Sequence, residues 1–135
     1  MTNKAQTIML VDDNNIDNYV NEHVITNHLP SSKVVKFDAA RDGLNYLASL
    51  ANNQYEIPDL ILLDINMPDI DGFGFLEEFG SLPNEVTAHT RISMLSSSKN
   101  PDDIKQSTRY QYVVKYFEKP LTDSKLDSVL SLLSA

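Results

Sequence analysis

Aspartate residues follow two short apolar runs in this chain of 135 residues. Asp64 comes directly after residues 60–63, and the pair Asp12 and Asp13 follows residues 8–11. An uninterrupted apolar run of this length is typical of a strand that is buried on both faces of a parallel sheet. Because neighbouring parallel strands end at the same edge, we expect the three carboxylates to share one pocket where ligands bind.

Three carboxylates in one small pocket repel one another, and burial raises the free-energy cost of each charge. A divalent cation would offset that cost. Oxygen ligands without nearby His or Cys favour a hard ion, Mg²⁺ rather than Zn²⁺, and bound Mg²⁺ keeps open positions for a phosphate group. Two simpler interpretations stay open at this point. Asp12 and Asp13 could cap a helix that begins near Asn15, and Asp64 could cap the turn that follows it.

Two further apolar runs also end in polar side chains. Residues 92–95 are followed by Ser96, and residues 113–117 are followed by Glu118 and then Lys119. If all these strand ends face one crevice, its expected lining is Asp12, Asp13, Asp64, Ser96 and Lys119. Such a site holds a carboxylate nucleophile, a metal pair, a hydroxyl donor and a cation. These groups suit the transfer of a phosphoryl group to a side-chain oxygen.

The elements that must position these residues alternate along the chain. Predicted strands cover residues 8–11, 33–37, 60–63, 92–95 and 113–117. The first helical pattern runs from Ile16 through Val20 and Val24 to Leu29, and two more cover residues 40–51 and 73–79. The last two predicted helices begin after the caps Asn100 and Thr122. This alternation predicts an α/β fold with a doubly wound parallel sheet of five strands and right-handed crossovers. The fourth helix has only Ile104 as an apolar anchor, so we expect it to be short and weakly held.

Length and composition narrow the class of protein further. The chain fits one domain, residues 1–135 with a folded core of about 6–133. The net charge of −8 argues against direct binding to nucleic acid or to an anionic membrane. The absence of Cys excludes disulfides and Cys-ligated zinc. No apolar run has the length of a membrane span, and residues 1–7 do not resemble a secretory signal, so we expect a cytoplasmic protein.

Four motifs in this order and spacing resemble the receiver domain of two-component response regulators (CheY-like). They are Val11-Asp12-Asp13, Leu62-Leu63-Asp64-Ile65-Asn66-Met67-Pro68 with Asp71-Gly72, Met94-Leu95-Ser96-Ser97, and Tyr116-Phe117-Glu118-Lys119-Pro120. Each motif alone is weak, but the set is highly specific and covers nearly the whole chain. The resemblance implies a flavodoxin-like (βα)5 fold with strand order 2-1-3-4-5.

The resemblance also implies a phosphorylation site. Asp64 would accept the phosphoryl group from a phosphohistidine of a sensor histidine kinase or of a histidine phosphotransfer protein. Mg²⁺ would be bound by Asp13, Asp64 and the backbone carbonyl of Asn66, with Asp12 acting mostly through water. The domain would be a signalling phosphoacceptor rather than an enzyme, although it would assist its own phosphorylation and dephosphorylation.

Three more residues receive roles from the same resemblance. Ser96 and Lys119 would each contact a phosphoryl oxygen, and the bond between Lys119 and Pro120 would be cis. Tyr116 falls at the position of an aromatic switch that turns inward when the phosphorylated site draws the Ser96 loop closer. No output domain follows the last predicted helix, as in single-domain regulators, so we expect the signal to reach a downstream protein target through surface contacts.

The chain departs from the family ahead of the fifth strand. The family often has a small residue there, whereas this chain has Arg109-Tyr110-Gln111-Tyr112. These aromatic residues are expected to be exposed and to belong to a contact surface.

Other classes fit the residues less well. A flavodoxin has a loop rich in Ser, Thr and Gly after its first strand, whereas residues 12–15 here would repel a phosphate without a metal. A phosphatase of the dehalogenase type has two Asp spaced by one residue at that position. The remaining alternative is a phosphorylation-independent adaptor with the receiver fold. Such adaptors usually lack the acceptor, an acid or the Lys, and this chain has all three.

Overall fold

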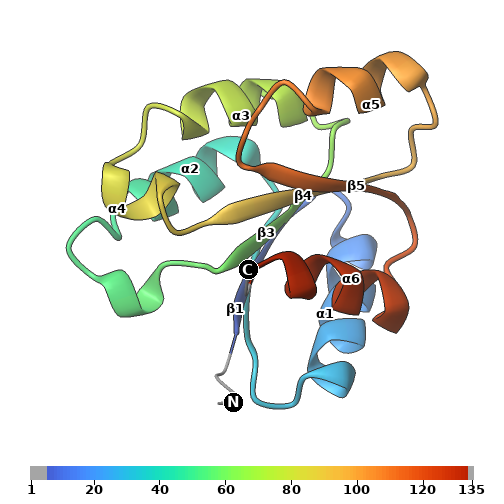
Figure 1. The fold of residues 1–135 in the computed structure, drawn as a ribbon, viewed down its shortest axis with the longest axis horizontal. Coiled ribbons are helices and arrows are strands. Elements are labelled where there is room, and N and C mark those ends of the chain that lie inside the picture. The colour runs from blue at the N-terminus through green and yellow to red at the C-terminus, as the bar shows by residue number, and fades with distance from the viewer. Residues whose placement is uncertain (1–5, 134–135) are drawn as a thin grey trace.

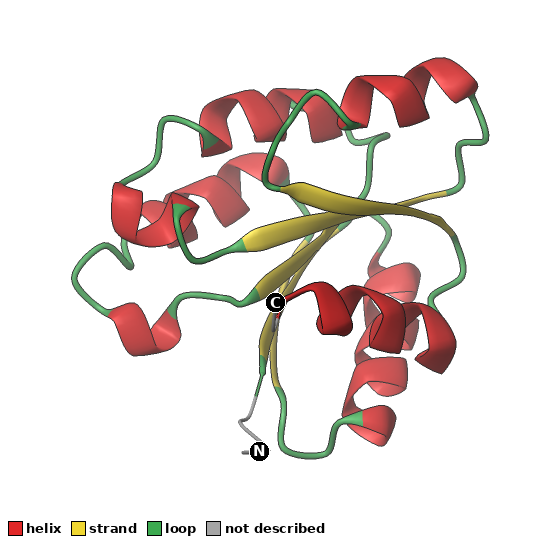
Figure 2. Cartoon of the chain, in the orientation of Figure 1, coloured by secondary structure: helices red, strands yellow, loops and turns green. Residues whose placement is uncertain are grey.

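A five-stranded parallel sheet forms the centre of the computed structural model, which describes residues 6–133. The strands are β1 (Thr7–Val11), β2 (Lys33–Phe37), β3 (Leu60–Leu63), β4 (Arg91–Ser96) and β5 (Val113–Glu118). Their order in the sheet is β2-β1-β3-β4-β5, and all neighbouring pairs are parallel. Figure 2 shows the strands in yellow, with helices on both sides of the sheet. The predicted doubly wound fold and its strand order are confirmed.

Helices cover both faces of this sheet (Figure 1). One face carries α1 (Asn15–His28) and α6 (Asp123–Leu133), and the other carries α2 (Ala40–Ala48), α3 (Gly72–Phe79), α4 (Asn84–Thr87) and α5 (Pro101–Ser107). Each strand contributes alternate residues to two apolar cores. In β1, Ile8 and Leu10 pack toward α1 and α6, whereas Met9 and Val11 pack toward α2 and α3. Burial on both faces explains the unbroken apolar runs in the sequence.

The register of the strands brings the polar residues to one edge of the sheet. Leu63 pairs with Val11 on one side and with Met94 on the other. Asp12 and Asp64 therefore leave the sheet side by side, each one residue beyond a paired position. This edge also receives the end of β4, where Ser96 pairs with Glu118.

Only part of the apolar pattern predicted for the first helix faces the core: Val24 and Leu29 pack against it, whereas the first two members of the pattern do not. Ile16 and Val20 are 73% and 46% exposed, whereas Asn18, Asn21 and Ile25 are buried. The reason is a need for hydrogen bonds at the strand ends. The side-chain amide of Asn18 donates to the backbone carbonyls of Asp12 (2.9 Å) and Phe37 (3.3 Å). The buried Asp12 carbonyl would otherwise lose this partner, whereas the Phe37 carbonyl also accepts from the Asp12 N–H at 3.1 Å.

The structure also differs from the predictions in the connecting segments. The second helix ends at Ala48 rather than near residue 51, and the backbone N–H of Ser49 bonds to the carbonyls of its last turn. A 3₁₀ helix (Gln54–Glu56) precedes β3, and the short α4 lies between α3 and β4; neither was predicted. Within residues 6–133, no helix combines the length and apolarity needed to cross a membrane.

The aromatic residues ahead of β5 are not an exposed surface, contrary to the prediction. Tyr112 is half-buried, with its ring centroid 4.9 Å from that of Phe79 in α3. Tyr110 is half-buried as well, and its hydroxyl donates to the Glu77 carboxylate at 2.6 Å. The bulky approach to β5 therefore packs against α3, where these rings occupy the space beside the end of that helix.

By contrast, α5 fits the prediction of a short, weakly anchored helix. It has seven residues, and Asn100 caps it by accepting a hydrogen bond from the Asp102 N–H. Its apolar residue Ile104 is 40% exposed, and Ser107 is its buried residue. A helix with so little buried apolar area can shift at a small free-energy cost.

Candidate functional site

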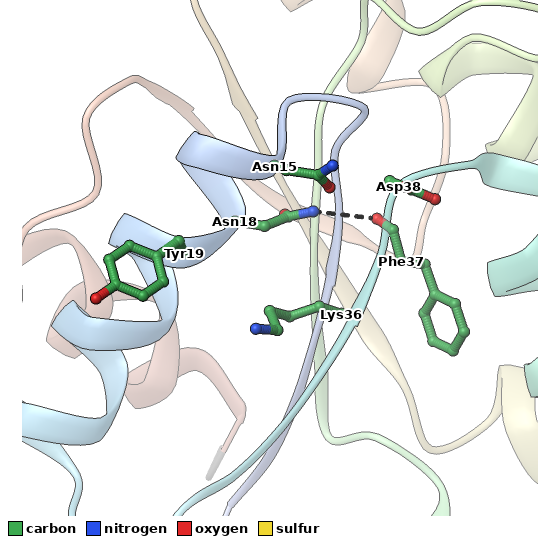
Figure 3. Close-up of a pocket in the computed structure, with 6 residues that line it drawn as sticks. All are labelled: Asn15, Asn18, Tyr19, Lys36, Phe37 and Asp38. Atoms are coloured by element: carbon green, nitrogen blue, oxygen red, sulfur yellow. Dashed lines mark hydrogen bonds between the residues drawn. The ribbon is translucent and has the colours of Figure 1, made fainter.

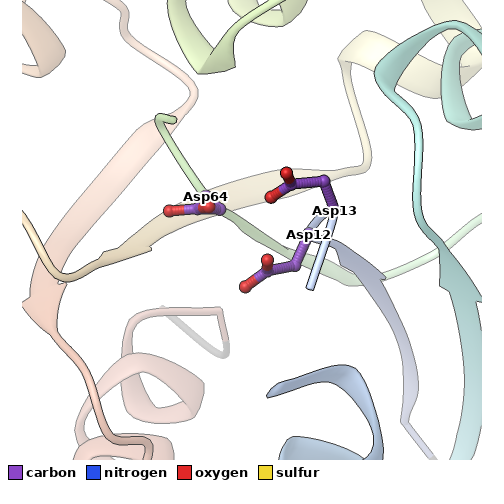
Figure 4. Close-up of side chains that lie close together, drawn as sticks. All are labelled: Asp12, Asp13 and Asp64. Atoms are coloured by element: carbon purple, nitrogen blue, oxygen red, sulfur yellow. The ribbon is translucent and has the colours of Figure 1, made fainter. Parts of the chain in front are cut away.

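Three carboxylates meet at the carboxyl edge of the sheet (Figure 4). One oxygen from each of Asp12, Asp13 and Asp64 lies within 4.8 Å of the others. Asp12 and Asp64 are buried, whereas Asp13 is exposed. In Figure 4 their carboxylates extend to the same side of the strand ends. The structure therefore brings together the acidic residues that the sequence predicted to share a pocket.

These carboxylates do not serve as helix caps. The side chain of Asn14 caps α1 by accepting hydrogen bonds from the N–H groups of Ile16 (3.0 Å) and Asp17 (3.1 Å). The cap of α3 is Asp71, which accepts from the Gly74 N–H at 2.8 Å. The interpretation of Asp12 and Asp13 as caps of α1 is thus wrong. Asp64 does accept hydrogen bonds from the backbone N–H groups of Ile65 and Asn66 in the turn that follows it, and these bonds act to lower its pKa. Capping alone does not explain why the three carboxylates lie together.

Asp64 occupies an environment that disfavours its charge. Its Oδ1 atom is buried and has no hydrogen-bond partner among the described residues. Burial, together with the negative charge of Asp12, raises the pKa of Asp64 to about 6, although the Lys119 ammonium acts in the opposite direction. An orphaned carboxylate oxygen next to other carboxylates is a position where a hard cation fits. The donor set of this site therefore suits Mg²⁺.

Lys119 closes the site from the end of β5. Its Nζ lies 2.7 Å from Asp12 Oδ2, 2.7 Å from Asp17 Oδ2 and 3.8 Å from Asp64 Oδ2. Burial lowers the pKa of Lys119, but the hydrogen bonds to Asp12 and Asp17 outweigh that effect and leave the pKa raised. The Lys119–Pro120 bond is cis. The ammonium is therefore charged and already has partners in this structure.

Asp17 is the residue at this site that the sequence did not reveal. An acidic residue in the first turn of a helix is common because its negative charge interacts favourably with the helix dipole. The presence of Asp17 in the sequence therefore did not indicate a role at the site. Its partner Lys119 is 102 positions away in the chain.

Ser96 and Tyr116 meet at the loop that follows β4. Ser96 is fully buried, and its hydroxyl accepts a hydrogen bond from the Ser98 N–H at 3.1 Å. The hydroxyl of half-buried Tyr116 donates to the carbonyl of the same residue, Ser98, at 2.9 Å. The backbone carbonyl of Ser96 accepts from the Lys119 N–H at 2.9 Å. One loop is thereby connected to Tyr116 and to the backbone that carries Lys119.

Gly72 lets α3 begin directly against the loop after β3. Its N–H donates to the Ile65 carbonyl at 2.7 Å. A Cβ at this position would lie 2.6 Å from the Asp64 carbonyl oxygen and 2.7 Å from the Ile65 Cα, both of them backbone atoms. Only glycine permits such a close approach. Asn66 is exposed in this loop, two residues beyond Asp64.

A hollow lies between the first turns of α1 and the end of β2 (Figure 3). Its lining residues are Asn15, Asn18, Tyr19, Lys36, Phe37 and Asp38. Figure 3 shows the Asn18 amide bonded to the Phe37 carbonyl across this hollow. The Phe37 ring turns away from the hollow and contacts Tyr46, with 5.1 Å between ring centroids. This bond fixes the start of α1 relative to the strand ends.

The sheet, its register and its acidic edge define a phosphoacceptor signalling domain, and comparison with known proteins agrees. The family described as the response regulator receiver domain matches residues 8–131. The chain belongs to this family.

Relatives and solved structures of the family cover much of the chain. Response regulator Rcp1 of Synechocystis sp. is 31% identical over 107 residues, which are 76% of this chain and 69% of that protein. A two-component response regulator from Cytophaga hutchinsonii superposes with a TM-score of 0.88 at 25% identity, covering 97% of this chain and 98% of the other. The phosphorylated cyanobacterial phytochrome response regulator RcpA is similar at 30% identity and a TM-score of 0.75, with coverage of 97% and 92%. The chain covers far less of some other curated relatives, 12% of the length in one case.

Proposed function

We propose that Asp64 is the phosphoryl acceptor of this receiver domain. The observation that carries the proposal is the acidic edge itself, where Asp12, Asp13 and Asp64 meet beside Lys119. One oxygen of the Asp64 carboxylate would be the metal ligand, and the other, Oδ2, which lies 3.8 Å from Lys119 Nζ, would be the nucleophile. This oxygen attacks the phosphorus of a phosphohistidine, the N–P bond breaks, and the imidazole leaves with the electron pair and takes up a proton. The product is an acyl phosphate on Asp64.

The metal ligands of this proposal are Asp13, Asp64 and the backbone carbonyl of Asn66. Asp13 is exposed and Asp64 has an unpaired oxygen, so both can offer ligand atoms. Asp12 already binds the Asn14 N–H and Lys119, which suits a contact through water. Bound Mg²⁺ would neutralise charge that develops on the transferred phosphoryl group. With these groups the domain assists its own phosphorylation and dephosphorylation.

The signal is proposed to leave through the loop after β4. The Ser96 hydroxyl, which accepts from the Ser98 N–H, would donate its hydrogen to a phosphoryl oxygen, and its movement toward Asp64 would pull on Ser98. Because Tyr116 bonds the carbonyl of the same Ser98, a shift of this loop changes the position available to the Tyr116 ring. The neighbouring α5 is weakly anchored and can follow. A downstream protein target would then recognise the changed surface of α5 and β5.

The phosphohistidine donor is proposed to bind the exposed apolar face of α1. Ile16, Tyr19 and Val20 are 73%, 60% and 46% exposed, and their spacing places them on one side of the helix next to the acidic edge. Large apolar side chains gathered on a surface mark a protein contact. A sensor histidine kinase or a histidine phosphotransfer protein that packs here would bring its histidine close to Asp64.

Tyr19→Ala should slow phosphotransfer from a protein donor at least about five-fold, because an exposed Tyr at the centre of an interface often contributes that much. The donor would be the phosphorylated histidine kinase that transfers fastest to the wild type in a panel. Phosphorylation by phosphoramidate, a small donor, should not change. The matched control is Tyr55→Ala, since Tyr55 is 86% exposed in the 3₁₀ helix before β3, at the other edge of the sheet. Equal rates for both variants with the protein donor would show that this donor binds elsewhere.

A further inference from the structure

Lys119 is shared unequally among three carboxylates. Its Nζ is 2.7 Å from both Asp12 and Asp17 but 3.8 Å from Asp64. A phosphoryl group on Asp64 would have to draw this ammonium toward itself. The two closer carboxylates therefore compete with the phosphoryl group for the same cation.

The two competitors differ in how readily they can release it. Asp12 is buried, with 6% of its side chain exposed, and its other oxygen is held by the Asn14 N–H at 2.9 Å. The side chain of Asp17 is 36% exposed. Water can solvate a partly exposed carboxylate after its partner leaves, whereas a buried carboxylate would remain unpaired. Asp17 is thus the partner that Lys119 can leave.

We propose that Asp17 is a positioning residue that holds the Lys119 ammonium away from Asp64 until a phosphoryl group is in place. This inference rests on the proposed role of Asp64 as acceptor. In the unphosphorylated protein, the Asp17 carboxylate keeps Lys119 at the α1 side of the site. Phosphorylation breaks this ion pair. Asp17 therefore lowers the affinity of the site for a phosphoryl group and favours the unphosphorylated form.

A role for Asp17 within α1 alone does not explain why its carboxylate contacts Lys119. The negative charge of an acidic residue at the third position of a helix interacts favourably with the helix dipole, and Asp17 has that position in α1. However, Asn14 already caps this helix through the N–H groups of Ile16 and Asp17. The Asp17 carboxylate instead points to Lys119, in the loop after β5.

The test compares the wild type with two variants in their affinity for beryllofluoride, a non-covalent mimic of the phosphoryl group, in the presence of saturating Mg²⁺. Asp17→Asn should bind it about two- to five-fold more tightly than the wild type, the effect of releasing a partly exposed ion pair. NMR titration would give the dissociation constants. Asp42→Asn is the matched control, because Asp42 has the same third position in α2, is exposed and makes no ion pair within residues 6–133. This control should bind as the wild type does.

A second arm shows whether the effect passes through Lys119. In a Lys119→Gln background, Asp17→Asn should change beryllofluoride affinity by less than about 1.5-fold, as a double-mutant cycle requires for coupled residues. An equal gain in both backgrounds would mean that Asp17 acts through its long-range charge, and the inference would be wrong. A weaker affinity of Asp17→Asn with Lys119 intact would also overturn it. If the wild type itself does not respond to beryllofluoride and Mg²⁺, the acceptor proposal fails, and this inference fails with it.

Discussion

Replacing Asp64 by asparagine is expected to raise the free energy of unfolding of the metal-free protein by about 1–3 kcal/mol at neutral pH. The carboxylate is buried, one of its oxygens has no partner among the described residues, and Asp12 lies beside it. A neutral amide of the same shape removes the cost of that charge. Lys119 keeps its two closer partners, Asp12 and Asp17, in the variant.

The increase in the free energy of unfolding caused by Asp64→Asn should be larger at neutral pH than in acid. The pKa of Asp64 is about 6 in the folded protein, above the 3.8 expected of an unperturbed Asp. Between these values the folded protein holds a proton that the unfolded chain has lost. The stability that Asp64 contributes is therefore fully present below about pH 4 and is lost as the pH rises through about 6. The wild type and the Asn variant should converge in acid and differ most at neutral pH.

Urea unfolding with a chelator at several pH values measures both effects. Added Mg²⁺ should narrow the difference in stability between the wild type and the variant, because the ion stabilises the protein that keeps the Asp64 carboxylate more strongly. Asp38→Asn is a suitable control, since Asp38 is exposed just after β2 and should not change stability in this way. An Asp64→Asn variant that is less stable than the wild type at neutral pH would show that the carboxylate is a structural group instead.

Asp13→Asn should weaken Mg²⁺ binding by about ten-fold or more, a loss of at least about 1.4 kcal/mol. Asp13 is the exposed member of the acidic edge and is proposed as a direct ligand. Asp12 is expected to contribute less, because its oxygens already contact the Asn14 N–H and Lys119. Isothermal titration calorimetry of Asp13→Asn and Asp12→Asn would show which carboxylate contributes more to Mg²⁺ affinity.

The same Asp38→Asn variant serves here as a control for long-range charge. Asp38 follows β2 at the same edge of the sheet but is not part of the acidic cluster. Its loss should change the Mg²⁺ dissociation constant less than about two-fold, since exposed charges are screened by salt. Similar small losses in all three variants would contradict the assignment of Asp13 as a ligand.

The strands were predictable because burial on both faces of a parallel sheet leaves a direct mark in the sequence. Residues 60–63 are apolar without interruption, and each of them is buried in β3. The edge on which Asp12 and Asp64 meet followed from the same pattern, because parallel strands end together. Local chemistry also predicted the caps Asn100 and Thr122, which both accept a hydrogen bond from a backbone N–H of the helix that follows.

The inward face of α1 was not predictable from periodicity. Its stripe of Ile16 and Val20 faces solvent, because the buried positions next to the site must supply hydrogen bonds, as Asn18 does. Pairings between distant residues were also beyond a local pattern. The contact of Asp17 with Lys119 and the packing of Tyr112 on Phe79 depend on how helices and strands meet in space. Polar residues in a helix near a functional edge are the signal that periodicity alone overlooks.

The most direct test of the account is to locate the phosphoryl group. The wild type would be incubated with acetyl phosphate and Mg²⁺, the acyl phosphate trapped by borohydride reduction, and the digested protein mapped by mass spectrometry. We predict one modified residue, Asp64, with no modification when a chelator is present or when Asp64 is replaced by Asn. Modification at another residue, or a mass gain that persists in Asp64→Asn, would contradict the assignment of Asp64 as the phosphoryl acceptor.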